Sequence, residues 1–151
     1  MNFTENPEIV TWPATHYVFV EKTGPFMNSA PQAWQEAHTF AAALSEHNPI
    51  TGAMSLYKMR EQTYRAGFIL AAPPVKLPAG LSYTYFDGGK YVRFVLTGPY
   101  SNLPEASRSA WAAVAEKKIQ LRDDWAIENY TNDPRSTPEA ELVTEILLPT
   151  V

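Results

Sequence analysis

At 151 residues with a formal net charge of −4, the chain is long enough to bury one hydrophobic core without disulfides or metals. Twelve basic side chains scattered along an acidic sequence do not supply the clustered positive surface that nucleic-acid binding requires. The absence of cysteine excludes a disulfide framework, a thiolate metal site and a cysteine nucleophile. We therefore expect one domain over residues 1–151 that makes no direct contact with nucleic acid.

The opening residues 1–13 do not read as a targeting segment. They carry Glu5 and Glu8 where a secretory signal has basic residues followed by an apolar run. No later segment has the length and apolar character of a membrane span. The expectation is a cytoplasmic protein that does not enter a membrane.

The chain contains an internal repeat whose two copies begin at Tyr17 and Tyr91. Each copy is a β-rich run that starts with Tyr-Val and ends with Thr-Gly-Pro and an aromatic residue, Phe26 in the first copy and Tyr100 in the second. Gly can turn the chain and Pro cannot donate to a sheet, so each run should end there. The repeat predicts two strands in equivalent positions.

A helix is expected after each of these strands. The first should begin at residues 29–31, where Pro falls in the first turn, and should stop near Asn48. The second opens at Pro104. Apolar residues recur at spacings of three and four in both segments, which is typical of a helix with one buried face. Each helix carries one tryptophan, Trp34 or Trp111.

A pair of strands follows each helix. The expected strands cover residues 52–58 and 64–71 in the first half, and residues 124–130 and 139–148 in the second. The order of elements is therefore βαββ, twice. Between the halves, residues 73–80 are rich in proline and read as a linker.

The two repeat halves are expected at about residues 14–72 and 81–151. Within the second half, residues 81–86 read as a strand with a tight turn that leads into Tyr91. One βαββ unit alone would leave a sheet edge and half of a core exposed. We therefore predict an α+β fold in which the two units form one antiparallel sheet, with both main helices on one side. The pseudo-two-fold seam between them is a natural place for a ligand cleft.

The sequence lacks the common catalytic and metal-binding motifs. It has no Gly-rich phosphate loop, no Gly-x-Ser-x-Gly segment and no His-Glu-x-x-His segment. Its histidines, His16, His38 and His47, do not have the spacing of metal ligands. We expect no metal and no cofactor, and no residue is assigned a catalytic role from the pattern.

Glu128 is the most informative candidate for a binding site. Strand alternation places Ala126, Glu128 and Tyr130 on one face. A carboxylate among aromatic rings would attract a cationic ligand, because low local dielectric strengthens the attraction and aromatic faces add cation–π contacts. The alternative is that Glu128 faces solvent on an edge strand, and the pattern alone leaves both readings open.

Further candidates are aromatic residues, which make up 13% of the chain, and a second carboxylate. Large flat side chains line ligand pockets as well as fill cores, so core packing is the alternative for each of them. Glu145 lies in an apolar strand, where it either points to solvent or adds a second acidic group to the site. The candidate ligand-binding residues are Glu128, Tyr130, Tyr57, Tyr91, Trp111, Tyr100, Phe26 and Glu145.

Several short motifs keep a particular order along the chain. They lie at residues 89–100, 127–134 and 137–146 in the second half, and at residues 23–26 and 64–68 in the first. This combination resembles the GyrI-like small-molecule-binding domain, the effector-binding domain of AraC-type and MerR-type multidrug regulators. The resemblance implies a duplicated βαββ fold and a buried glutamate that recognises lipophilic cations in an aromatic pocket.

By its position in the Ile-Glu-x-Tyr strand, the glutamate implied by the resemblance is Glu128. The regulators also carry a DNA-binding domain, whereas only about a dozen residues precede the first expected strand here. The resemblance therefore implies a stand-alone module whose partner is a small hydrophobic, cationic compound. Two alternatives stay open, because some relatives hydrolyse electrophilic small molecules with a pocket Glu and Tyr, and others modulate DNA gyrase. The sequence identifies no protein partner.

Overall fold

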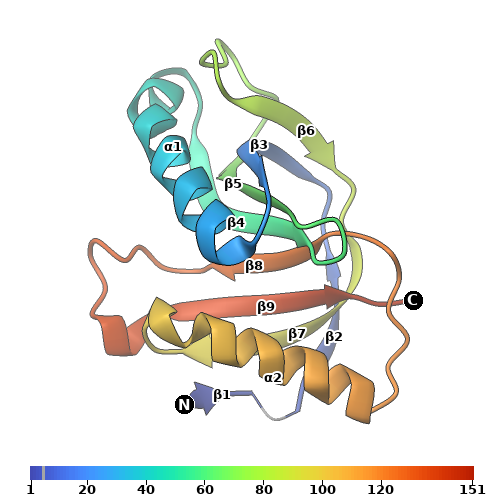
Figure 1. Cartoon of the computed structure of the whole chain (residues 1–151). Helices are drawn as coiled ribbons and strands as arrows, with labels where there is room; N and C mark the ends of the chain where they lie inside the picture. Colours follow the sequence, from blue (N-terminus) through green and yellow to red (C-terminus); the bar gives the residue numbers. More distant parts are fainter. Residues whose placement is uncertain (5) are drawn as a thin grey trace. The chain divides into compact units, whose positions relative to one another are not determined.

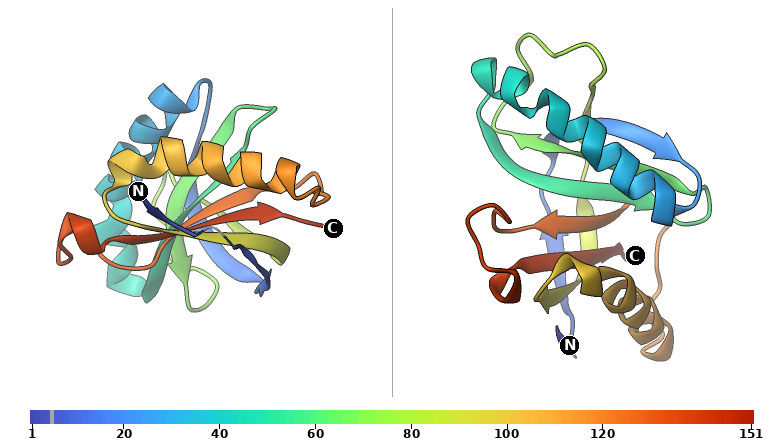
Figure 2. Two further views of the ribbon diagram at one scale, coloured as in Figure 1. Left: turned by 90° about the horizontal axis from the view of Figure 1, so that it is seen from below. Right: turned by 60° about the vertical axis from the view of Figure 1, so that its left-hand side comes forward.

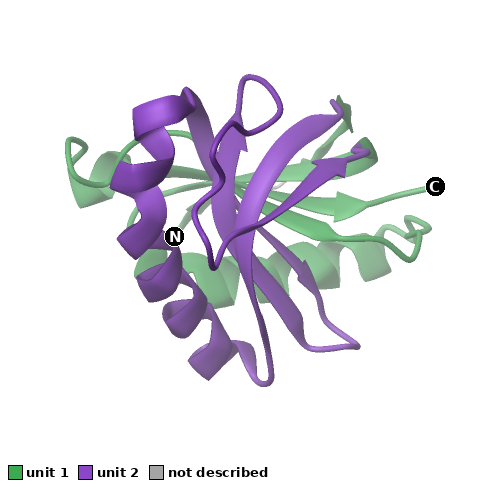
Figure 3. Cartoon of the chain, turned by 90° about the horizontal axis from the view of Figure 1, so that it is seen from above, with its two compact units in different colours: residues 1–12, 89–151 green, residues 13–88 purple. Residues whose placement is uncertain are grey.

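The computed structural model describes residues 1–4 and 6–151; Glu5, noted above for its charge, lies outside the described residues. The chain forms two compact units, unit 1 from residues 1–12 and 89–151, and unit 2 from residues 13–88 (Figure 3). Each unit consists of antiparallel strands and one long helix. The predicted α+β class with antiparallel strands and two main helices is confirmed, while the cleft at the seam between the halves stays a prediction.

Unit 2 is a four-stranded antiparallel group with one helix (Figure 1). Its strands are β3 (Thr15–Thr23), β4 (Ile50–Lys58), β5 (Thr63–Leu70) and β6 (Ser82–Phe86), in the spatial order β4, β5, β3, β6. The helix α1 (Phe26–His47) packs against β3 and β5. The strand expected at residues 81–86 therefore pairs inside unit 2, with β3.

The helix α1 begins at Phe26, so the predicted start at residues 29–31 is wrong. Two backbone amides of the first turn donate to the carbonyl oxygen of Pro25, each at 2.9 Å, which starts the helix directly after the Thr-Gly-Pro turn. Pro31 lies inside the helix, in its second turn, where it lacks the backbone N–H that would pair with the carbonyl oxygen of Met27. The helix ends at His47, as the sequence predicts.

Unit 1 contains the remaining strands. These are β1 (Asn2–Phe3), β2 (Glu8–Trp12), β7 (Gly89–Thr97), β8 (Ala126–Tyr130) and β9 (Val143–Pro149). Their order is β1, β7, β9, β8, and β2 also pairs with β7. All of these pairings are antiparallel.

The helix α2 (Leu103–Glu116) covers one face of the unit 1 strands. It follows a short 3-10 turn, η1 (Tyr100–Asn102), and packs against β7 and β9. The views in Figure 2 show α2 running along these strands. On β7, the fully buried Phe94 and Leu96 alternate with the partly exposed Val95. We call the buried face, which α2 covers, the helix face of unit 1.

The expectation that the first strand follows about a dozen residues is wrong. Residues 8–12 pair with β7 in continuous register, from Glu8 opposite Arg93 to Trp12 opposite Gly89. The consecutive β-branched residues Ile9, Val10 and Thr11 favour this extended segment. It covers an edge of β7 that would otherwise expose unpaired backbone groups.

The two strands after α2 are shorter than predicted. The strand β8 begins at Ala126, two residues after the expected start. Residues 139–141 form a 3-10 turn, η2 (Glu139–Glu141), in place of the first part of the expected last strand. The backbone amide of Leu142 donates to the carbonyl oxygen of Glu139 at 3.3 Å, so the strand β9 starts only at Val143.

The two units share the same turn geometry and the same buried tyrosine. The Thr-Gly-Pro turns place Gly24 at a φ of 114° and Gly98 at a φ of 137°, a region that residues with a Cβ rarely adopt. Tyr17 and Tyr91 are both fully buried. Their hydroxyl groups donate to backbone carbonyl oxygens of their own unit, at 2.8 and 2.7 Å. The repeated residues thus perform the same structural task in both copies.

The two helices also match residue by residue. Both have buried positions one helical turn apart on the side that faces the strands. At one constant offset, the buried residues Ser29, Ala33 and Ala37 of α1 match Ala106, Ala110 and Val114 of α2. The same offset aligns Trp34 with Trp111, and both tryptophans are half-buried. The two tryptophans therefore occupy equivalent places on their helices.

Candidate functional site

The strand β8 presents Glu128 and Tyr130 on the helix face of unit 1. In the register of β8 with β9, Glu128 lies opposite Ile146 and Tyr130 lies opposite Thr144. Residues opposite one another share a face, and Ile146 is in turn opposite the buried Phe94. The hydroxyl group of Tyr130 donates a hydrogen bond to Oε1 of Glu128 at 3.0 Å.

Burial makes ionisation of the Glu128 carboxyl group less favourable than in water. Loss of surrounding water raises the pKa of Glu128 from 4.5 to about 7, although the hydrogen bond from Tyr130 acts in the opposite direction. Among residues 1–4 and 6–151, no basic side chain forms an ion pair with this carboxylate. A half-buried carboxylate with a raised pKa and no ion pair among these residues is a candidate for a ligand site.

An aromatic pair adjoins the carboxylate. The rings of Tyr100 and Tyr130 meet at an angle of 64° with their centroids 5.5 Å apart. Unit 2 has the equivalent pair, Phe26 and Tyr57, at 75° and 5.6 Å. The structure thus divides four of the predicted site residues into two pairs, one in each unit, and places Tyr100 beside the partner of Glu128.

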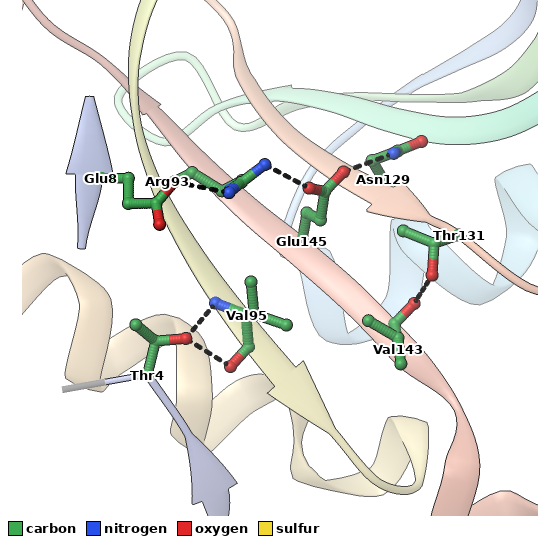
Figure 4. Close-up of polar contacts among 8 residues, drawn as sticks. All are labelled: Thr4, Glu8, Arg93, Val95, Asn129, Thr131, Val143 and Glu145. Atoms are coloured by element: carbon green, nitrogen blue, oxygen red, sulfur yellow. Dashed lines mark hydrogen bonds and ion pairs between the residues drawn. The ribbon is translucent and has the colours of Figure 1, made fainter. Parts of the chain in front are cut away.

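Glu145 lies on the face of unit 1 opposite to Glu128. Its Oε2 is 3.3 Å from Nη1 of Arg93, which also pairs with Glu8 at 2.7 Å (Figure 4). Its Oε1 accepts a hydrogen bond from the amide of Asn129 at 2.7 Å. Glu145 therefore belongs to a polar network that links β2, β7, β8 and β9, and it is not brought together with Glu128.

Tyr91 also lies away from Glu128. It alternates with the helix-face residues of β7, and its hydroxyl group donates to the carbonyl oxygen of Trp125 at 2.7 Å. The guanidinium of Arg122 lies 4.8 Å from the centre of its ring. Burial raises the pKa of Tyr91 well above its usual value near 10. These contacts give Tyr91 a structural role within unit 1.

Three polar side-chain atoms of unit 1 are buried without a hydrogen-bond partner in the described part of the chain. They are Nε1 of Trp12, at the end of β2, Nε1 of Trp111, on α2, and Oγ1 of Thr144, on β9. The sequence singled out Trp111 for its ring but did not single out Thr144. A polar residue in the apolar run of residues 142–148 was the available signal, and its interpretation required the strand register.

Within residues 1–4 and 6–151, no group of three His, Asp or Glu side chains has an arrangement that could hold a metal ion. No helix formed by these residues is both long and apolar enough to cross a membrane.

Comparison with known families identifies the fold and its general role. Residues 5–151 match the GyrI-like small molecule binding domain. The chain belongs to the GyrI-like family. The resemblance noted in the sequence is thus confirmed over nearly the whole chain, and with it a small-molecule-binding domain. A comparison with curated proteins found no match.

Several solved structures are similar to this GyrI-like domain over nearly its whole length. The C-terminal domain of EcmrR is 16% identical, with a TM-score of 0.76 and coverage of 97% of both chains. SAV2435 bound to tetraphenylphosphonium is 14% identical, with a TM-score of 0.74 and coverage of 97% of this chain and 94% of the other. A hydrolase from Listeria innocua is 13% identical, with a TM-score of 0.63 and coverage of 96% and 91%. At these identities the likeness establishes a common fold.

Proposed function

We propose that this GyrI-like domain binds a small hydrophobic organic cation on the helix face of unit 1, with Glu128 as the charge partner. The observation that carries the proposal is the half-buried carboxylate that has no cationic partner among the described residues. A bound cation would neutralise this charge where water is scarce, and an ion pair is stronger there than in bulk solvent. The domain would then act as a sensor or a sequestering protein.

The aromatic pair beside Glu128 supports a cationic and apolar ligand. Tyr100 and Tyr130 present ring faces and edges at 5.5 Å from one another, and the face of a tyrosine attracts cations. The hydrogen bond from Tyr130 fixes the orientation of the carboxylate before a ligand arrives. The common fold with SAV2435, which binds tetraphenylphosphonium, also supports the proposal.

The test uses three probes of similar shape and different charge. Tetraphenylphosphonium is a cation, tetraphenylborate is an anion and triphenylphosphine oxide is neutral. Binding is measured by calorimetry and thermal shift at pH 8, where the Glu128 carboxyl is mostly ionised. We expect the cation alone to bind and to raise the melting temperature. Equal binding of the cation and the anion would contradict an electrostatic role for Glu128.

The pH dependence of binding gives a second test. Since the pKa of Glu128 in the free protein is about 7, a cation binds to the ionised form and competes with a proton. The affinity for tetraphenylphosphonium should fall about tenfold for each pH unit below about 7. An affinity that stays constant from pH 5 to pH 8 would rule out Glu128 as the charge partner.

Hydrolysis of an electrophilic small molecule is the second candidate function. A carboxylate with a pKa of about 7 is suited to act as a general base near neutral pH, and the adjacent Tyr130 hydroxyl carries a proton. Turnover distinguishes the two functions. A hydrolase would release product from a strained electrophile at a rate that Glu128→Gln abolishes, whereas a binding module would return its ligand unchanged.

A further inference from the structure

In unit 2, the indole N–H of the helix tryptophan has hydrogen-bond partners on two strands. Nε1 of Trp34 donates to Oγ of Ser55 at 3.1 Å and to the hydroxyl oxygen of Tyr64 at 3.0 Å. Ser55 and Tyr64 are themselves 2.6 Å apart. One residue from each of α1, β4 and β5 therefore forms a closed polar cluster under the helix.

The equivalent residues of unit 1 can be identified from the repeat. In the sequence repeat, Ser55 aligns with Glu128, and the helix offset aligns Trp34 with Trp111. The third member follows from the strand register. Tyr57 is opposite Tyr64 in unit 2, and its counterpart Tyr130 is opposite Thr144 in unit 1. Thr144 therefore occupies the place of Tyr64.

The cluster is incomplete in unit 1. A threonine is too short to reach a helix tryptophan as Tyr64 does, and no hydrogen bond joins Glu128 to the indole of Trp111 among the described residues. Accordingly, Nε1 of Trp111 and Oγ1 of Thr144 are both buried without a partner among the described residues. Leaving a buried donor unpaired is destabilising, so such groups call for a partner that arrives with a ligand.

We propose that Trp111 and Thr144 form a polar subsite in unit 1 that takes a neutral hydrogen-bond acceptor of the ligand, such as a ketone or amide oxygen. This inference rests on the proposed function, because the acceptor belongs to the same molecule whose cationic group pairs with Glu128. Trp111 is half-buried as a residue, so a small rotation of its ring can turn the indole N–H toward a ligand. The ligand class is then an apolar cation that also carries a carbonyl group.

Two matched cations test the subsite. (4-Benzoylbenzyl)trimethylammonium has a ketone oxygen, and in its analogue a methylidene group replaces that oxygen with little change of shape. In calorimetry at pH 8, the ketone should bind roughly tenfold more tightly than its methylidene analogue, because a tenfold ratio corresponds to the contribution of about one buried hydrogen bond. Trp111→Phe should reduce this ratio to about one, and Thr144→Val should reduce it in part. Trp34→Phe, in the closed cluster of unit 2, is the matched control and should keep the ratio.

The outcomes separate the subsite from the proposed function. If wild-type protein binds both cations equally, the subsite is refuted while cation binding stands. If neither these cations nor tetraphenylphosphonium binds, the proposed function fails and the subsite fails with it. If Trp34→Phe removes the ratio as completely as Trp111→Phe, the effect is structural and the subsite is refuted.

A second measurement needs no ligand. Both Trp→Phe changes remove the same atoms, but only Trp34 loses hydrogen bonds that the structure shows. Trp111→Phe should therefore lower the melting temperature less than Trp34→Phe does. An equal or larger loss in Trp111→Phe would mean that its N–H has a partner in the free protein, and would overturn the inference.

Discussion

Replacing Glu128 by glutamine should stabilise the ligand-free protein at alkaline pH. Moving a carboxyl pKa from 4.5 to about 7 costs the ionised form about 3 kcal/mol, and less to the extent that the partly exposed side chain remains hydrated. Glutamine has no charge to desolvate, and its amide oxygen can still accept the hydrogen bond from Tyr130.

The effect should appear only above pH 4.5. Below this pH the carboxyl is neutral in folded and unfolded chains, so its ionisation adds no difference between wild type and Glu128→Gln. As the pH rises from 4.5 to about 7, the unfolded chain loses its proton first, and the wild-type protein loses stability relative to the variant. Above pH 7 the difference is complete and should reach roughly 6–12 °C in melting temperature at most.

Thermal unfolding of wild-type and variant protein at pH 4.5, 6, 7 and 8 measures this difference. Glu145→Gln is the matched control, because Glu145 lies on the opposite face of the same strands and pairs with Arg93. It should be neutral or slightly destabilising, by at most about 1 kcal/mol, and should keep the affinity for cations. A Glu128→Gln protein that is no more stable than wild type at pH 8, or equally stabilised at pH 4.5, would refute the desolvation argument.

Three further changes test the contacts described above. Tyr130→Phe removes the hydrogen bond to Glu128, which should raise the pKa of Glu128 further and weaken cation binding at pH 7 several-fold, as calorimetry at several pH values would show. Tyr91→Phe removes the bond to a backbone carbonyl and should cost about 1 kcal/mol of unfolding free energy in urea without changing cation affinity. Gly67→Ala would drive a Cβ into the backbone of β3, and circular dichroism should show loss of folded protein.

The repeat made much of the fold predictable. The Thr-Gly-Pro turns at residues 23–25 and 97–99 marked the ends of β3 and β7, because the conformational limits of Gly and Pro hold whatever surrounds them. Alternation within β8 also placed Glu128 and Tyr130 on one face. Each of these inferences depends only on residues close together in the sequence.

Features set by contacts between distant residues were not predictable. Glu145 was a site candidate because its strand looked apolar, and only the register of β8 with β9 shows that it faces away from Glu128. The pairing of residues 8–12 with β7 joins segments far apart in sequence. The unpartnered hydroxyl of Thr144 required the position of every neighbouring acceptor.

The chain path of unit 1 has a consequence for how the protein is made. The strand β2 emerges from the ribosome before unit 2, and its partner β7 follows only after all of unit 2 has been synthesised. Unit 2 is continuous in sequence and can fold as soon as it is released, whereas β2 stays an unpaired, β-branched segment until then. The hydrogen bond between Glu8 and Arg93 joins residues 85 positions apart in the sequence, and such long-range pairings form late in folding. Residues 8–12 are thus translated before unit 2 but pair with β7 only after unit 2 is complete.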